Sequence, residues 1–152
     1  MTKKITFLLS KKRDSANFAN NNIKISNYMN AISTTNAPAA IGPYSQAIEA
    51  NGTVYVSGQL PIDPATGNFA EGGIKAEARQ SLTNIKNILA EAGLTMKNVA
   101  KVTVLLADIN NFAAVNEVYA EFFEAPYPAR SAFAVAALPK NANIEIEAIA
   151  VK

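Results

Sequence analysis

Residues 144–151 read Ile-Glu-Ile-Glu-Ala-Ile-Ala-Val, and this alternation predicts a β-strand with two unlike faces. Successive side chains of a strand point to opposite sides of the sheet. One face would therefore be wholly apolar and consist of Ile144, Ile146, Ala148 and Ala150. The other face would carry Glu145, Glu147, Ile149 and Val151. The pattern fits a strand whose apolar face lies on the protein core and whose second face is exposed.

A helix is predicted over residues 74–92, well before this strand. Its apolar side chains recur at helical spacing, and Gly93 stands where a helix C-terminal glycine is expected. The apolar stripe consists of Ile74, Ala78, Leu82, Ile85 and Leu89. The opposite face carries Lys75, Arg79, Lys86 and Glu91, which we interpret as a solvated face rather than a nucleic-acid patch.

Between this helix and the final strand, three further elements are predicted. Residues 99–106 are rich in Val and Leu and indicate a strand. Asn110 or Asn111 can cap a second helix that runs to about Phe123 and ends before Pro126 and Pro128. Its apolar stripe consists of Phe112, Val115, Tyr119 and Phe122. Residues 131–136 indicate the next strand, followed by a turn at Leu138-Pro139.

The first half of the domain begins with a hairpin. Residues 45–50 and 53–59 flank Asn51-Gly52, a two-residue turn whose members both tolerate positive φ. The element order is ββ-α-β-α-ββ, with a further strand near Ile32, which predicts an α+β fold with two helices on one face of a mixed sheet. Because no third helix is available to cover the other face, we expect an oligomer.

The composition excludes several kinds of chemistry. The 152 residues form one domain by length, and they include no Cys, His or Trp. A Ser-His-Asp triad, a thiol nucleophile, a disulfide and an ordinary zinc site are therefore excluded. Acid–base chemistry near neutral pH must use a carboxylate, Tyr, Lys, backbone groups or water.

The formal charge of +2 is unevenly spread. Residues 1–28 carry six basic side chains and one acidic side chain, whereas residues 29–152 carry eight basic and eleven acidic ones. Residues 1–28 thus form a basic extension of +5, and residues 29–152 form the domain, at −3. Three interpretations of the extension are open: a disordered tail, an organelle presequence, or upstream sequence before a start at Met29. We favour the last. Its apolar run at residues 5–9 is too short for a signal peptide, which needs about 7–15 residues. We expect a cytoplasmic protein, or an organellar one if the extension is a presequence.

Four positions could carry chemistry, each with a structural alternative. Arg130 leads into an apolar strand and either pairs with a protein carboxylate or binds a ligand carboxylate or phosphate in two-point fashion. Glu145 is either solvated or, at an interface, a partly buried general base. Tyr44 follows a Gly-Pro turn and either packs or orients a ligand or water. Asn116 lies within a helix, where Asn is disfavoured, and either faces solvent or bonds a neighbouring segment or ligand.

Four motifs in this order resemble the RidA (YjgF) family of reactive-intermediate imine deaminases. They are Asn-Ala-Pro-Ala-Ala-Ile-Gly-Pro-Tyr-Ser-Gln at 36–46, Val-Ser-Gly-Gln-Leu-Pro at 56–61, Tyr-Pro-Ala-Arg-Ser at 127–131 and the strand at 144–151. The resemblance covers about residues 30–152. It implies a chorismate-mutase-like α+β fold, a homotrimer with ligand sites between subunits, and hydrolysis of 2-imino acids or their enamine tautomers to 2-keto acids and ammonia. It implies no metal or organic cofactor.

The resemblance also implies roles for individual residues. The carboxylate-binding arginine of the family corresponds to Arg130, the acidic residue of the closing strand to Glu145 and the pocket tyrosine to Tyr44. The helix asparagine that shapes the site corresponds to Asn116, and Ser57-Gly58-Gln59 matches a pocket-lining strand end. Many members carry a cysteine where this chain has Ala132, so thiol-based regulation there is not expected. Residues 124–127 form a shorter segment than in some members, which could alter the pocket rim.

Two other functions remain open from the residues alone: a trimeric module that senses small keto acids, and a ribonuclease or translation inhibitor. The sequence has no His pair for RNA cleavage, and its domain is net negative, whereas RNA binding favours a basic surface. Nucleic-acid partners are therefore not expected. A membrane is not expected either, because no stretch of the sequence approaches the roughly 20 apolar residues that span a bilayer.

Deleting residues 1–28 tests where any RNA affinity resides. Because the +5 charge belongs to this extension, deletion should abolish nonspecific RNA binding and leave imine hydrolysis unchanged. Filter binding and a hydrolysis assay on the full chain and on residues 29–152 measure both. RNA binding that survived the deletion would place the affinity in the domain.

Overall fold

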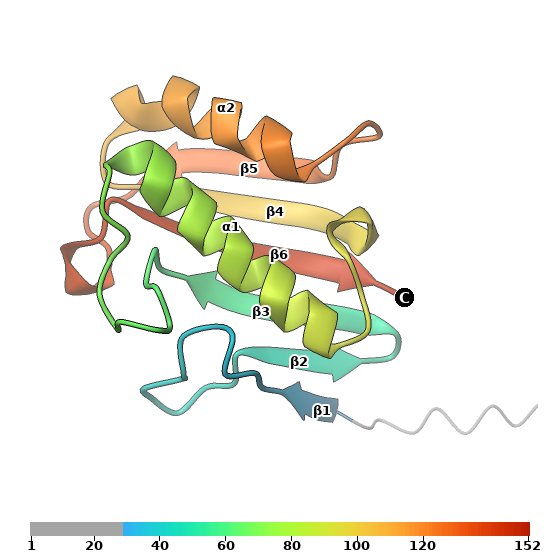
Figure 1. Cartoon of the computed structure of the whole chain (residues 1–152). Helices are drawn as coiled ribbons and strands as arrows, with labels where there is room; N and C mark the ends of the chain where they lie inside the picture. The colour runs from blue at the N-terminus through green and yellow to red at the C-terminus, as the bar shows by residue number, and fades with distance from the viewer. Residues whose placement is uncertain (1–28) are drawn as a thin grey trace, which may run out of the picture.

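The computed structural model describes residues 29–152, so the expectations for the extension at 1–28 lie outside it (Figure 1). The strands are β1 (Met29–Ile32), β2 (Ala47–Ala50), β3 (Thr53–Gln59), β4 (Val99–Leu106), β5 (Ala129–Ala134) and β6 (Ile144–Val151). The helices are α1 (Ile74–Glu91) and α2 (Phe112–Phe122). Three short 3-10 turns lie at η1 (Met96–Asn98), η2 (Ile109–Asn111) and η3 (Pro139–Asn141). The predicted element order, with the extra strand that contains Ile32, is confirmed.

The strands form one six-stranded mixed sheet in the order β1-β2-β3-β6-β4-β5. Strand β6 lies in the interior, antiparallel to both β3 and β4. Strands β4 and β5 are parallel, and α2 makes the crossover between them. Both helices lie on the same face of the sheet (Figure 1), which confirms the predicted α+β arrangement.

The core lies between this face and the helices. The apolar face of β6 is buried there, together with matching residues of β3 and β4, because directly paired residues share a face. The fully buried sheet residues include Val54, Val102, Val104, Leu106, Ile144 and Ile146. From α1 the stripe residues Ala78, Leu82, Ile85 and Leu89 are all fully buried. The buried residues that α2 contributes to the core are Val115, Val118 and Tyr119.

Local signals placed several boundaries correctly. Asn51 and Gly52 both have positive φ, and Ala50 pairs with Thr53, so the predicted hairpin turn is confirmed. Gly93 also has positive φ, and Leu94 N–H donates to the Leu89 carbonyl at 2.8 Å, which ends α1 in a Schellman motif.

Two boundary predictions need correction. Strand β5 begins at Ala129 rather than at residue 131, because residues 129–134 pair continuously with β4. Arg130 therefore lies within the strand and not beside it. Asn111 does precede α2, but its side chain forms no cap hydrogen bond. The Asp108 side chain instead accepts a hydrogen bond from Asn110 N–H at the start of η2, one turn earlier.

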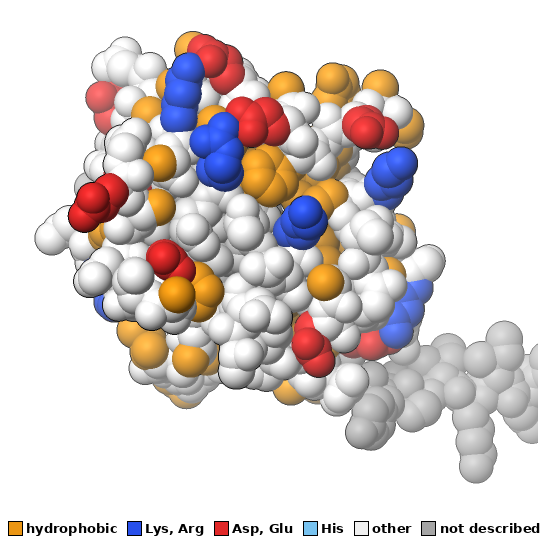
Figure 2. Space-filling view, in the orientation of Figure 1, with side chains coloured by type: hydrophobic (Ala, Val, Ile, Leu, Met, Phe, Trp, Pro, Cys, Tyr) orange, Lys and Arg blue, Asp and Glu red, His pale blue; other side chains and the backbone are white. Residues whose placement is uncertain are grey.

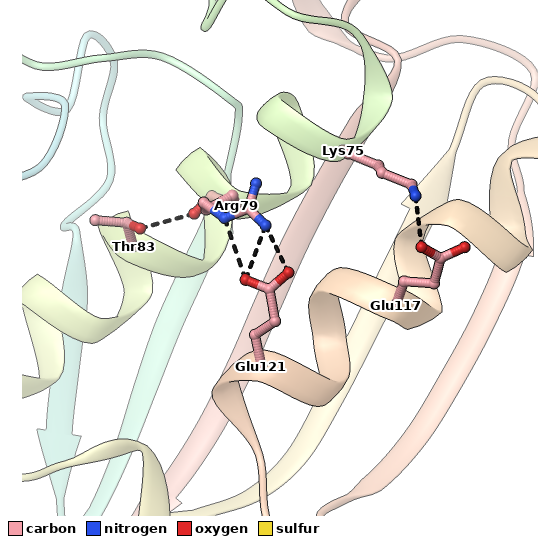
Figure 3. A network of polar contacts seen from close by, with 5 residues as sticks. All are labelled: Lys75, Arg79, Thr83, Glu117 and Glu121. Carbon is pink, nitrogen blue, oxygen red and sulfur yellow. Dashed lines mark hydrogen bonds and ion pairs between the residues drawn. The ribbon is translucent and has the colours of Figure 1, made fainter.

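The charged face of α1 contacts α2 through two ion pairs (Figure 3). The Lys75 ammonium pairs with the Glu117 carboxylate, and the Arg79 guanidinium forms a two-point contact with the Glu121 carboxylate. The hydrogen bond from Arg79 lowers the pKa of Glu121. The partners lie four residues apart on each helix, so the two pairs repeat with the helical turn. Exposed pairs of this kind contribute little stability.

The surface formed by the helices carries charges of both signs. In Figure 2, basic and acidic side chains are interspersed on this face and no broad basic patch is seen, in line with the interpretation of a solvated face. Within residues 29–152, no helix has the length and apolar character needed to cross a membrane.

A buried amide ties α1 to the loop after β3. Asn84 is fully buried, and its Nδ2 donates to the Leu60 carbonyl at 3.2 Å and to the Ile62 carbonyl at 2.9 Å. Its Oδ1 accepts a hydrogen bond from Gln80 at 2.9 Å. The side chain thus satisfies backbone carbonyls of an irregular segment that the sheet does not pair.

Replacing Asn84 with Ala should lower the free energy of unfolding by about 2–4 kcal/mol, because two carbonyls would lose their donor. Asn87→Ala is the matched control: Asn87 also donates from α1 to a loop carbonyl, that of Asn36, but in an exposed setting. The control should cost about 1 kcal/mol or less. Urea unfolding at one protein concentration measures both, and equal losses would contradict the role given to the buried amide.

Candidate functional site

A cavity of about 560 Å³ opens beside β3 and the start of β6. Four of the predicted site residues line it: Tyr44, Ser57, Gly58 and Glu145. Gln59, from the same predicted strand end, also lines it. Most of the remaining wall is apolar and comes from loops, with Pro38, Ile41, Leu60, Ile62, Pro64 and Pro139. A polar group on an otherwise apolar wall is typical of a small-molecule site.

The carboxylate of Glu145 lies directly against the backbone of Gly58. A Cβ atom built on Gly58 would fall 2.8 Å from Glu145 Cδ and closer still to Oε1, so only glycine leaves room for the carboxylate. The register between β3 and β6 shifts in this region: Val56 pairs with Ala148, but Gln59 pairs with Ile146. One extra residue therefore forms a bulge at residues 57–58, and bulges of this kind often redirect groups at functional sites.

Partial burial changes the acidity of Glu145. Desolvation raises the pKa of its carboxyl group, and the nearby charge of Glu147 raises it further. The carboxylate is then more basic than that of a solvated glutamate. This property suits a proton acceptor that works near neutral pH.

Two side chains hold the strand segments that border the cavity. The Ser57 hydroxyl donates to the Ser45 carbonyl at 2.7 Å, so it joins β3 to the segment that follows Tyr44. Gln46 is buried, and its Nε2 donates to the carbonyls of Thr34 and Pro38 at 3.0 and 2.8 Å. The Gln46 side chain therefore shapes the loop that supplies Pro38 and Ala39 to the cavity wall.

Sequence reasoning missed several contributors to this cavity. Lys140 lines it from η3, where Lys140 and Asn141 both have positive φ. The Leu138-Pro139 turn was predicted, but nothing local indicates that it reaches the cavity. Gln46 and Asn84 were missed as supports for a different reason. Each is an amide side chain within an apolar stretch of sequence, and this could have indicated a buried polar contact. Its partners, however, are backbone carbonyls, which the sequence does not identify.

Two predicted site residues lie elsewhere. Arg130 lies on the helix-covered face of the sheet, because it pairs in register with Val102, which in turn pairs with the buried Ala148. Its guanidinium carbon lies 4.5 Å from the centre of the Tyr119 ring and 5.3 Å from that of Phe112, both on α2. Asn116 is on the same helix and is half-buried.

Glu145 belongs to the opposite face, because it pairs with Leu105 of β4. Within one protomer the predicted residues thus form two groups, separated by the sheet: the cavity residues, and Arg130 with Asn116. Among residues 29–152, no three His, Cys, Asp or Glu side chains come together in a way that could hold a metal ion.

Comparison with known proteins gives a consistent set of relatives. The family model described as Endoribonuclease L-PSP matches residues 34–152. A 2-iminobutanoate/2-iminopropanoate deaminase from Capra hircus is 60% identical over 121 residues, which cover 80% of this chain and 88% of that protein. RidA from the Antarctic bacterium Psychrobacter sp. PAMC 21119 is 48% identical with a TM-score of 0.78, over 81% of this chain and 99% of that one. Escherichia coli TdcF with bound serine is 46% identical with a TM-score of 0.78, over 81% and 98% of the two chains.

Gly58→Ala should expel the Glu145 carboxylate from its position, because the new methyl group would overlap it. With the carboxyl group moved toward solvent, the pKa of Glu145 should fall toward its ordinary value. A carbon-detected NMR titration of the glutamate carboxyl groups measures this shift. Gly42→Ala is the control, since a Cβ there would lie 3.6 Å from the Tyr44 ring, an ordinary contact. An unchanged titration of Glu145 in Gly58→Ala would contradict the steric argument.

Proposed function

This chain belongs to the Endoribonuclease L-PSP family, the RidA family of the resemblance, and we propose that it hydrolyses 2-iminobutanoate and 2-iminopropanoate to 2-keto acids and ammonia. The observation that carries the proposal is the partly desolvated Glu145 carboxylate, held against Gly58 in a mostly apolar cavity. The names of curated relatives at up to 60% identity support the same reaction. The chain has no histidine or cysteine, and this reaction requires neither.

Arg130 would bind the substrate carboxylate through the two-point contact that a guanidinium offers, and this contact would orient the imine. Glu145 would position a water molecule and accept its proton while the water oxygen adds to C2 of the protonated imine. The electron pair of the C=N bond moves to nitrogen and gives a tetrahedral adduct. Tyr44 and the backbone near Gly58 would bind the nitrogen end of this adduct.

Product release needs the proton to return. Glu145 would pass its proton to the amine nitrogen of the adduct, which makes that nitrogen a good leaving group. The C–N bond then breaks and releases ammonia, while the hydroxyl oxygen forms the carbonyl and gives its proton to the Glu145 carboxylate. Transfer of this proton from Glu145 to ammonia gives ammonium and restores the carboxylate, and the 2-keto acid leaves. Because a protonated imine is already electrophilic, one carboxylate and one arginine suffice for the chemistry.

We propose the homotrimer that the family resemblance implies, with ligand sites between subunits, and the separation of the two groups supports sites shared between protomers. Arg130 and Glu145 of one protomer lie on opposite faces of the sheet, so one small ligand would need them from two protomers. The face of the sheet away from the helices supports this arrangement. It exposes about half of the Tyr55 and Phe133 side chains, at 49% and 48%, which a neighbouring copy would cover.

The alternative is a trimeric module that binds small keto acids without catalysis. The relative TdcF was solved with bound serine, so ligand binding has a precedent in a related structure. The raised pKa of Glu145 favours catalysis, because it suits a proton acceptor. A site that only binds keto acids would gain nothing from a protein carboxylate placed near the carboxylate of the ligand. The two functions differ in one outcome: the module would bind 2-ketobutyrate saturably without accelerating imine hydrolysis.

Arg130→Ala should lower kcat/KM for 2-iminobutanoate at least about 100-fold, because two charge-assisted hydrogen bonds to the carboxylate would be lost. Threonine dehydratase generates the imine, and release of 2-ketobutyrate is followed with and without the variant. Arg79→Ala is the control, since Arg79 pairs with Glu121 on the surface and should leave the rate unchanged. Light scattering should show the same oligomer for all three proteins. An Arg130→Ala protein with the parental rate would overturn the assignment of Arg130.

A further inference from the structure

Arg130 lies on an aromatic surface formed by α2. Its guanidinium carbon is 4.5 Å from the centre of the Tyr119 ring and 5.3 Å from that of Phe112. Both distances fall within the roughly 6 Å over which a cation is attracted to a ring face. Tyr119 is itself buried, and its ring centre lies 4.4 Å from that of Phe123.

Such a contact matters most for a long side chain that must present its guanidinium in one orientation. A free arginine side chain carries about 2 kcal/mol of rotamer entropy, part of which is lost when it binds a ligand. A side chain already restrained by ring contacts loses less on binding, so its affinity for the ligand is higher. The planar guanidinium can lie on one ring through its face while its N–H groups remain available at the edge.

We propose that Tyr119, assisted by Phe112, is a positioning residue that pre-orients Arg130 for the substrate carboxylate; this inference rests on the proposed role of Arg130. Tyr119 acts through its ring rather than its hydroxyl group. The hydroxyl oxygen is buried and has no hydrogen-bond partner among the described residues. Burial also raises the pKa of Tyr119 to about 12, so the ring stays neutral over the working range of pH.

Because the hydroxyl group forms no hydrogen bond, substitutions can separate the role of the Tyr119 ring from that of its hydroxyl group. Tyr119→Phe keeps the ring and removes a buried polar group that forms no bond, so it should preserve both packing and function. Tyr119→Leu keeps an apolar side chain but removes the ring face. Phe123→Leu is the matched control, because it removes a buried ring from the same cluster that contacts Tyr119 and is not one of the rings under Arg130.

Calorimetric binding of 2-ketobutyrate and steady-state hydrolysis of 2-iminobutanoate test the proposal on the full chain. Tyr119→Leu should weaken 2-ketobutyrate binding by about threefold to thirtyfold, the range expected for loss of a partly desolvated cation–π contact. KM for the imine should rise in parallel, with a much smaller change in kcat. Tyr119→Phe and Phe123→Leu should stay within about twofold of the parent protein in both measurements.

An NMR signature reports the contact without using activity. The ring current of Tyr119 should shift the Arg130 Nε–H resonance upfield, and this shift should disappear in Tyr119→Leu and persist in Tyr119→Phe. If Tyr119→Leu is too unstable to study, Phe112→Leu replaces it, because the Phe112 ring is only half-buried; a smaller loss of affinity in the same direction is expected.

The outcomes separate this inference from the proposed function. If Arg130→Ala abolishes hydrolysis while Tyr119→Leu loses the NMR shift but binds 2-ketobutyrate like the parent, the positioning role is wrong and the proposed function stands. If Arg130→Ala hydrolyses the imine at the parental rate, Arg130 is not the carboxylate-binding residue, and the positioning role of Tyr119 is wrong with it. Equal losses of affinity in Tyr119→Leu and Phe123→Leu would show a general packing effect and would also overturn the positioning role.

Discussion

The register of β6 is the constraint on which the rest of the molecule depends. The strand is hydrogen-bonded to β3 on one side and to β4 on the other, and its alternate residues point either to the helices or away from them. A shift by one residue would place Glu145 and Glu147 in the apolar layer under α1 and expose Ile144 and Ile146. Burying two unpaired carboxylates in that layer is costly enough to exclude the shifted register.

The same register distributes the chemistry between the two faces of the sheet. Glu145 emerges on the uncovered face, where the bulge in β3 brings it against Gly58 and partial burial raises its pKa. Arg130 emerges two strands away on the helix-covered face, where it contacts the rings of α2. The separation is therefore a direct result of strand pairing. In the proposed mechanism, one ligand would therefore contact the arginine of one copy and the carboxylate of another.

The irregular segments around the cavity depend on buried amides. Gln46 binds carbonyls of the loop before β2, and Asn84 binds carbonyls of the loop after β3. Backbone groups in these loops have no sheet partner, so the two side chains take the place of a neighbouring strand. The Lys75–Glu117 and Arg79–Glu121 pairs link α1 to α2 at the exposed surface of the helices.

The sequence by itself determined the features that depend on local geometry. The alternation of residues 144–151, the Asn51-Gly52 turn and the end of α1 at Gly93 all follow from periodicity or from φ at single positions. Five of the six candidate residues lie in the quoted motifs, Asn116 was identified as an Asn within a predicted helix, and four of the six line one cavity. Only the tertiary structure decided that Arg130 lies within β5 over Tyr119, that Lys140 reaches the cavity, and that Asn84 binds residues 22 and 24 positions away. These features depend on which distant segments meet, and strand pairing and helix packing set that only once the whole chain has folded.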